Sequence, residues 1–226
     1  MKMEKQQSRE DLIAALTEDL TPVERVKPAQ GAWLIAFAAV VASVCCIAIF
    51  EFWTGMFTGE ASAFYWITNA LLLVLGAAST SGLVASALPR VGARGNAPYW
   101  SAAMLGMAPL TAIISVFFLE MNHDHTSGLP SVLNDPLTWY WECGLYGSIA
   151  GSVVALAAVL YLRRGAPVSL ERSGWLTGLA AGSLGALAYN LTCPLDTVAH
   201  VGIWHTVPVL VWAVIGRLAV PRLIRW

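Results

Sequence analysis

Charged side chains are scarce in this sequence, at 12% of residues, which is about half the fraction found in soluble domains. Apolar residues make up 57%. They gather in stretches at 32–52, 64–88, 98–119, 139–162, 173–193 and 197–220, and about 20 apolar residues suffice to cross a bilayer core as a helix. The sequence therefore predicts an all-α membrane protein, with an N-terminal segment over residues 1–30 and a bundle of six transmembrane helices over residues 31–226.

Basic residues are missing from every second connection between these stretches. All 13 Lys and Arg residues fall in the N-terminal tail, in the second and fourth connections, or toward the C-terminal end. The first, third and fifth connections have none. Because basic residues beside membrane spans are retained in the cytoplasm, we expect a multi-pass protein with both termini in the cytoplasm.

Motifs for catalysis and for nucleic-acid binding are also missing. The sequence has no phosphate-binding glycine loop, no basic stripe interleaved with aromatic residues, and no nucleophile and base paired at a plausible site. The first ~30 residues lack the basic start, apolar run and cleavage site of a secretory signal peptide. We therefore expect no enzyme activity, no cofactor and no direct contact with nucleic acid, and we expect the N-terminal segment to be retained.

Polar and ionisable residues are nearly absent from the middle of the apolar stretches. Asn190 lies toward the outer end of the fifth stretch, His205 about two turns into the sixth, and Arg217 near its inner end. Transporters and channels usually carry an ionisable residue deep within a span, where it marks an ion or proton path. This scarcity disfavours transport. A small metal or solute permease stays open as the alternative, recognisable by an ionisable residue that lines a central cavity.

The N-terminal segment contains a predicted amphipathic helix. Ser8 is a suitable N-cap with an acidic residue three positions later, and Pro22 is expected to end the helix. At 100° per residue, one stripe carries four apolar side chains, those of Leu12, Ile13, Leu16 and Leu20. The opposite side carries Glu10, Asp11 and Glu18. A helix of about twelve residues is marginal in water, so we expect it to order fully only when its leucine stripe is covered.

Two kinds of cover fit this stripe: the bilayer or bundle surface, and a protein partner. Interfacial helices favour Lys and Arg, which attract anionic lipids, whereas this segment sets Arg9 against several carboxylates. An acidic face beside a leucine stripe suits a basic protein surface. We therefore expect a protein partner to bind the residues Glu10, Asp11, Leu12, Ile13, Leu16 and Leu20.

Small residues form smooth faces on two of the predicted spans. The fifth has four at four-residue spacing, namely Gly174, Gly178, Gly182 and Ala186, and the fourth has Gly147 and Gly151. Such faces allow helices to approach closely in a membrane. Because the fourth and fifth spans are joined by a short connection, we expect these two helices to pack together.

Several short motifs occur along the chain in the same order as in a known family. They are DLIAAL at 11–16 and DLTPV at 19–23 before the spans, CPLD at 193–196 after the fifth span, Trp204, and the terminal PRLIRW at 221–226. In their order and spacing the chain resembles the NrsF family of bacterial inner-membrane anti-sigma factors. The resemblance implies a protein that holds an extracytoplasmic-function sigma factor at the membrane and releases it under metal or oxidative stress. A sigma factor is a basic, DNA-binding protein, which fits the acidic tail.

The resemblance also implies a sensor built on two cysteines, which correspond here to Cys143 and Cys193. The predicted topology places both at the outer face, where a facing pair of thiols is able to cycle between dithiol and disulfide or to capture a soft metal. Cys45 and Cys46 lie within the first span, and we expect them to be inert packing residues.

All four histidines belong to the outer half of the predicted bundle. His200 and His205 join Cys143 and Cys193 as candidate metal ligands, although none of the usual short ligand spacings is present. His123 and His125 flank Asp124 in a connection, where ordinary solvated residues are the favoured interpretation. For His200 and His205 an ordinary structural role stays equally open. The predicted signal is thus a metal ion or an oxidant at the outer face.

Overall fold

The computed structural model describes residues 2–18, 26–88, 96–122 and 140–225, and every regular element within them is a helix. The all-α prediction is therefore confirmed for this part of the chain. In chain order the helices are α1 (Lys2–Glu18), α2 (Pro28–Phe50), α3 (Gly55–Thr58), α4 (Ala63–Ser86), α5 (Ala97–Leu105), α6 (Met107–Asn122), α8 (Glu142–Leu162), α9 (Leu170–Asn190), α10 (Val198–Trp204) and α11 (Val207–Leu223).

Five helical segments of the described chain are long and apolar enough to cross a membrane. They are α2, α4, the first 18 residues of α5 and α6 together, α8, and α10 with α11. The predicted fifth span corresponds to α9, which has 21 residues but is not among these segments. The expectation of six apolar spans is thus confirmed only in part. α9 falls short in hydropathy because Ser, Thr and Gly replace larger apolar side chains along it.

The location of α9 explains its composition. It packs against α2, α4, α8 and α11, and fifteen of its 21 residues are buried. By contrast, α2 buries five of its 23 residues and exposes large apolar side chains such as Trp33, Phe37 and Ile49. A helix that is enclosed by other helices needs small side chains for close packing, whereas a helix that faces lipid needs apolar ones.

The glycine faces bring helices together, but only partly in the predicted pairing. Gly178 lies against α11, where a Cβ atom would collide with the backbone carbonyl of Trp212. The contact with α8 is made by Gly185 instead, whose added Cβ would meet the backbone of Gly147 and Gly151. The prediction that the fourth and fifth spans pack together is confirmed. The predicted faces contribute to that contact in part, because Gly147 lies against Ala186, whereas Gly174, Gly178 and Gly182 lie against α11.

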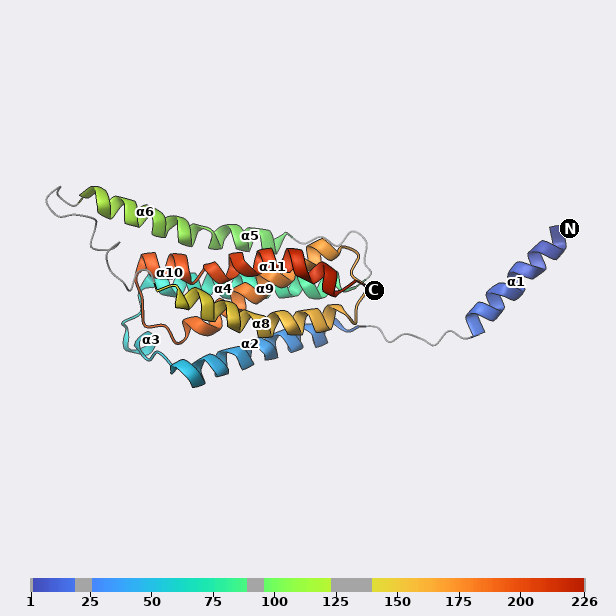
Figure 1. Ribbon diagram of the computed structural model, residues 1–226, viewed down its shortest axis with the longest axis horizontal. Helices are drawn as coiled ribbons and strands as arrows, with labels where there is room; N and C mark the ends of the chain where they lie inside the picture. The colour runs from blue at the N-terminus through green and yellow to red at the C-terminus, as the bar shows by residue number, and fades with distance from the viewer. Residues whose placement is uncertain (1, 19–25, 89–95, 123–139, 226) are drawn as a thin grey trace.

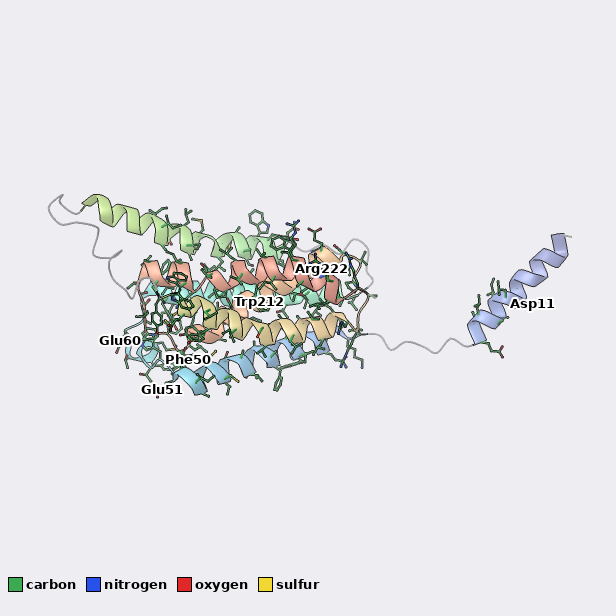
Figure 2. The ribbon with its side chains drawn as sticks, in the orientation of Figure 1. Asp11, Phe50, Glu51, Glu60, Trp212 and Arg222 are labelled. Carbon is green, nitrogen blue, oxygen red and sulfur yellow. The ribbon has the colours of Figure 1, made fainter. Side chains whose placement is uncertain are left out.

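The bundle has two ends of different charge. In Figure 1 the beginning of α2 and the C-terminus lie at one end, here called the tail end, whereas α3, α10 and the beginning of α8 lie at the other, here called the site end. Figure 2 shows Arg222 at the tail end and Glu51 and Glu60 at the site end. At the tail end, Arg163 Nε donates a hydrogen bond to the Leu223 carbonyl at 2.9 Å. The tail end also holds an ion pair between Arg217 and Glu171 at 3.1 Å. The basic residues at this end follow the pattern on which the topology prediction rests.

The N-terminal helix differs from its prediction in where it begins. α1 starts at Lys2, so Ser8 lies inside the helix rather than at its N-cap. The residues before Ser8 include Lys, Met, Glu and Gln, which are good helix formers and extend the helix backward. Figure 1 shows α1 extending away from the bundle. Leu20 and Pro22 lie outside the described residues.

Candidate functional site

Four potential metal ligands converge at the site end of the bundle. Cys143 is the second residue of α8, and Cys193 follows the end of α9. His200 lies in α10, and His205 lies in the two-residue break between α10 and α11. The four are separated by up to 62 positions in the sequence, from 143 to 205. Their meeting is therefore a product of how the helix ends pack.

The distances within this cluster are short. Cys143 Sγ lies 3.6 Å from Cys193 Sγ, and both are free thiols. Cys193 Sγ lies 3.6 Å from His200 Nε2, and the rings of His200 and His205 meet edge to face with their centroids 5.1 Å apart. One ligand atom from each of the four residues can be chosen so that all lie within 4.8 Å of one another. We call these four residues the Cys/His cluster.

The Cys/His cluster is shielded from solvent. The exposed fractions of Cys143 and Cys193 are 2%, and those of His200 and His205 are 0% and 1%. Among the described residues, His200 Nδ1 and both ring nitrogens of His205 lack a hydrogen bond of normal geometry, although a ring nitrogen of His205 lies within 4.8 Å of Cys193 Sγ. A buried polar group without a partner costs about 1–3 kcal/mol, so these nitrogens mark a place where a ligand is favoured.

Local sequence explains how the two histidines reach the cluster. The Thr197 hydroxyl accepts a hydrogen bond from the His200 backbone N–H at 3.2 Å and caps the start of α10. Pro208 occupies the first turn of α11, where proline starts a helix readily but cannot continue one from before. The predicted sixth span therefore breaks between α10 and α11, and His205 lies at this break.

An apolar wall encloses the cysteine side of the cluster. Cys46, Ala150 and Ala188 pack with Cys143 and Cys193 in one buried group, with Phe50, Tyr146, Leu195 and Trp204 around it. The Phe50 ring lies 4.6 Å from that of Tyr146 and 5.3 Å from that of Tyr189, measured between centroids. Because Phe50 is the last residue of α2, this wall joins α2 to the helix ends that hold the cysteines.

A polar network fastens the chain beside Cys193 to the start of α4. The Asp196 carboxylate accepts hydrogen bonds from the backbone N–H and the hydroxyl of Ser62, and Ser62 is the N-cap of α4. One turn into α4, the Tyr65 hydroxyl donates to the Asn190 carbonyl at 2.7 Å. The Asn190 side-chain amide donates to Asn69 Oδ1 at 2.8 Å. This network was not predicted from the sequence, because its partners lie more than 120 positions apart.

The other two cysteines do not belong to the close four-ligand group. Cys45 is exposed on α2, whereas Cys46 packs beside the cysteine pair without belonging to the close four-ligand group. His123 and His125 lie outside the described residues. Among the six Cys and His residues that the structure describes, Cys143, Cys193, His200 and His205 form the close group.

The residues predicted to bind a partner lie on α1 and face solvent. Leu12, Ile13 and Leu16 have exposed fractions of 59%, 60% and 64%, and Glu10 and Asp11 are also exposed. Figure 2 shows Asp11 on α1, away from the bundle. Within the described residues this helix therefore presents apolar side chains that its own chain leaves uncovered.

The fold and the cluster define a helical protein with several apolar helices of spanning length and a buried group of thiols and imidazoles at one end. The family model described as "negative regulator of sigma F" matches residues 16–226. The probable anti-sigma-F factor NrsF of Azospira oryzae is 27% identical over 220 residues, an alignment that covers 96% of this chain and 99% of that protein. No solved structure matches the chain. The chain belongs to the NrsF family of anti-sigma factors, which confirms the resemblance found in its sequence motifs.

Proposed function

We propose that this chain spans the bacterial inner membrane six times, holds an extracytoplasmic-function sigma factor through α1, and releases it when the Cys/His cluster responds to a metal or an oxidant. The family match over residues 16–226 carries this proposal, because it assigns the chain a partner that is a sigma factor. The exposed apolar side chains of α1 supply a surface on which such a partner can bind.

The proposed topology makes α9 the sixth crossing. Five apolar segments alone would place the two termini on opposite sides, whereas the N-terminal end of the bundle and the C-terminus lie at the same end. An enclosed α9 reconciles these observations, because a helix surrounded by helices can cross a bilayer without a strongly apolar surface. A reporter active only in the periplasm should be silent when fused at residue 226 and active near Glu60 or Asp196. Activity at residue 226 would contradict six crossings.

The partner surface on α1 has an apolar side and acidic side chains. Leu12 and Leu16 are one turn apart and lie within about 40° of each other around the helix. Their side chains would fill an apolar groove of the sigma factor while Glu10 and Asp11 meet basic groups. Burial of these exposed leucines by a partner is favourable, because it removes apolar surface from water.

A route from the cluster to α1 runs through α2. Tyr146 lies one turn after Cys143 in α8, and Tyr189 lies one turn before Cys193. Both tyrosine rings contact Phe50 at the end of α2, and the opposite end of α2 follows the chain segment that carries α1. A ligand or disulfide that repositions the two cysteines would shift Phe50 and, with it, the whole of α2. A coupling of about 1–3 kcal/mol is sufficient to change sigma-factor occupancy strongly.

The permease alternative calls for an ionisable residue deep in the bundle. In the part of the chain that the structure describes, no Asp, Glu, Lys or Arg is buried. The buried histidines are at the site end rather than in the middle of a span. Transport therefore gains no support from these residues, and regulation of a sigma factor is the function that the family match favours.

The test is to purify the full-length chain from membranes together with candidate sigma factors of the same genome. We expect one sigma factor to be retained, and to be released when cadmium or dichromate is added at the outer face. Failure of every sigma factor to be retained would overturn the partner assignment. Retention that persists in the presence of both agents would overturn the sensing step alone.

A further inference from the structure

The spacing of the Cys/His cluster matches a tetrahedral metal site. Bonds of about 2.3 Å to thiolate sulfur and about 2.0 Å to imidazole nitrogen give a tetrahedron with edges of about 3.3–3.8 Å. The Cys143–Cys193 and Cys193–His200 distances are both 3.6 Å. All four ligand atoms already lie within 4.8 Å of one another, so small side-chain rotations complete the set.

The histidine nitrogens provide a second, independent observation. His200 and His205 are fully enclosed, yet three of their four ring nitrogens lack a normal hydrogen bond within the described structure. A pair of thiols that only forms a disulfide has no need of two buried imidazoles beside it. A cation that accepts one lone pair from each ring removes the cost of burying these nitrogens.

We infer that Cys143, Cys193, His200 and His205 form a closed, four-ligand site for a thiophilic divalent cation of the Zn²⁺ or Cd²⁺ class. Sulfur and imidazole ligands select such ions, whereas Mg²⁺ and Ca²⁺ require oxygen ligands. The carboxylate of Asp196, three residues after Cys193, is bound to Ser62. Four protein ligands leave no open position for a substrate, which is typical of structural and sensory sites rather than catalytic ones.

Charge balance favours occupation of this buried site. Binding replaces the two thiol protons with the cation, so M²⁺ and two neutral thiols give a neutral complex and two released protons. The two imidazoles bind as neutral ligands. A neutral complex avoids the large free-energy cost of an isolated buried charge. Metal affinity should therefore rise with pH, as the two protons leave more easily.

The regulatory consequence of this inference rests on the proposed function. A bound cation ties together the start of α8, the end of α9 and the break between α10 and α11. His205 is joined to the start of α11 through the single residue Thr206, and α10 packs on α6, where Gly202 contacts Ala108 and Ala112. The cation would therefore fix the relative positions of α6, α8, α9 and α11 at the site end.

The experiment titrates Co²⁺, Zn²⁺ and Cd²⁺ into the reduced, chelator-treated full-length protein in detergent. Co²⁺ should bind at one equivalent and give the intense visible absorption and thiolate charge-transfer bands of a tetrahedral S₂N₂ site, and Zn²⁺ should displace it. Cadmium NMR of the unmodified protein should report two sulfur and two nitrogen ligands. Absence of binding, or a spectrum with sulfur and oxygen ligands alone, would overturn the site.

Variants assign the ligands. His200→Ala and His205→Ala should each weaken metal binding by at least about 10- to 100-fold, a loss known even for residues that only support a ligand. His205→Cys keeps a ligand and should restore binding, with charge-transfer absorption that reflects a third sulfur. The control is His123→Ala with His125→Ala, which should bind as the unmodified protein does. Unchanged affinity in both the His200 and His205 variants would restrict the site to the thiols.

The two proposals can fail separately. If the metal titrations fail while the chain still retains a sigma factor, the metal site is wrong and the anti-sigma function stands. If the metal binds as described but no sigma factor is retained, the site is real and its assignment to sigma-factor release is wrong.

Discussion

The leucine stripe of α1 and the Cys/His cluster are incomplete in opposite ways. On α1, Leu12, Ile13 and Leu16 are apolar and exposed, whereas in the cluster His200 and His205 are polar and buried. An exposed apolar stripe is stabilised when a partner buries it, and only a macromolecule is large enough to cover it. A buried set of electron-pair donors is stabilised by a metal ion that is small enough to fit among the four side chains. The contrast predicts two ligands of different size, one at each end of the signalling path.

The largest effect is expected from breaking the α1 end alone. Leu12→Asp with Leu16→Asp removes two apolar contacts, and the loss of either one, at about 2–5 kcal/mol when buried, is enough to lower sigma-factor binding by tens- to thousands-fold. Reporter genes of the sigma factor should then be active without stress, while cobalt binding at the cluster is unchanged.

Ala14→Asp provides the matched control for these leucine variants. It adds one carboxylate to the same helix, as each leucine substitution does, but about 200° around from Leu12. It should repress as the unmodified chain does. If Ala14→Asp releases the sigma factor equally well, added charge rather than loss of the leucine stripe explains the effect.

The reciprocal change breaks the cluster and leaves α1 intact. Cys143→Ser with Cys193→Ser should keep repression and abolish release by cadmium, because two of the four proposed ligands are lost. Measured target-gene induction should fall to the unstressed level. Cys45→Ser is the control, since Cys45 is exposed on α2, and it should respond normally. Full induction in the double variant would leave the cysteines without a role in sensing.

A smaller effect is expected from weakening the connection between the two regions. Phe50→Ala removes the contacts of α2 with Tyr146 and Tyr189, so both metal binding and repression should persist while cadmium-induced release is reduced. The coupling at stake is about 1–3 kcal/mol. Phe37→Ala on the same helix is the control, because Phe37 is 66% exposed. Equal behaviour of the two variants would exclude α2 as the route.

The smallest effect concerns the network beside Cys193. Asp196→Asn keeps an acceptor for Ser62 but removes a negative charge at the start of α4, worth about 0.3–1 kcal/mol. Thermal unfolding in detergent should therefore shift slightly, with the metal spectrum unchanged. A lost or altered cobalt spectrum would identify Asp196 as a ligand and change the proposed set.

Sequence reasoning reached the helical architecture and the cysteine pair by different routes. The length of the apolar stretches predicts most of the helices directly, because about 20 apolar residues in a row are typical of a helix that can cross a bilayer. The sequence of α9 reads as one more apolar stretch like the others. The structure shows a different role, because α9 is enclosed by α2, α4, α8 and α11 and its many small residues allow this close packing. Hydropathy does not distinguish a helix that other helices enclose from a helix that is only weakly apolar.

Ligand spacing is the point at which the sequence was least informative. Cys143, Cys193, His200 and His205 match no short metal motif, because they come from the ends of different helices and meet only after packing. The sequence does contain two signals that position the histidines. Thr197 caps the start of α10, and Pro208 in the first turn of α11 accounts for the break that holds His205. The pairing of glycine faces was likewise set by neighbours, as Gly185 rather than Gly178 meets α8.

The central claim is that the Cys/His cluster controls the affinity of α1 for a sigma factor. It is tested most directly by measuring that affinity with full-length chain in lipid nanodiscs, with and without saturating Cd²⁺. The account predicts that Cd²⁺ weakens binding about 5- to 150-fold in the unmodified chain and has no effect in the Cys143→Ser, Cys193→Ser variant. Equal affinity with and without Cd²⁺ in the unmodified chain, at confirmed metal occupancy, would contradict it.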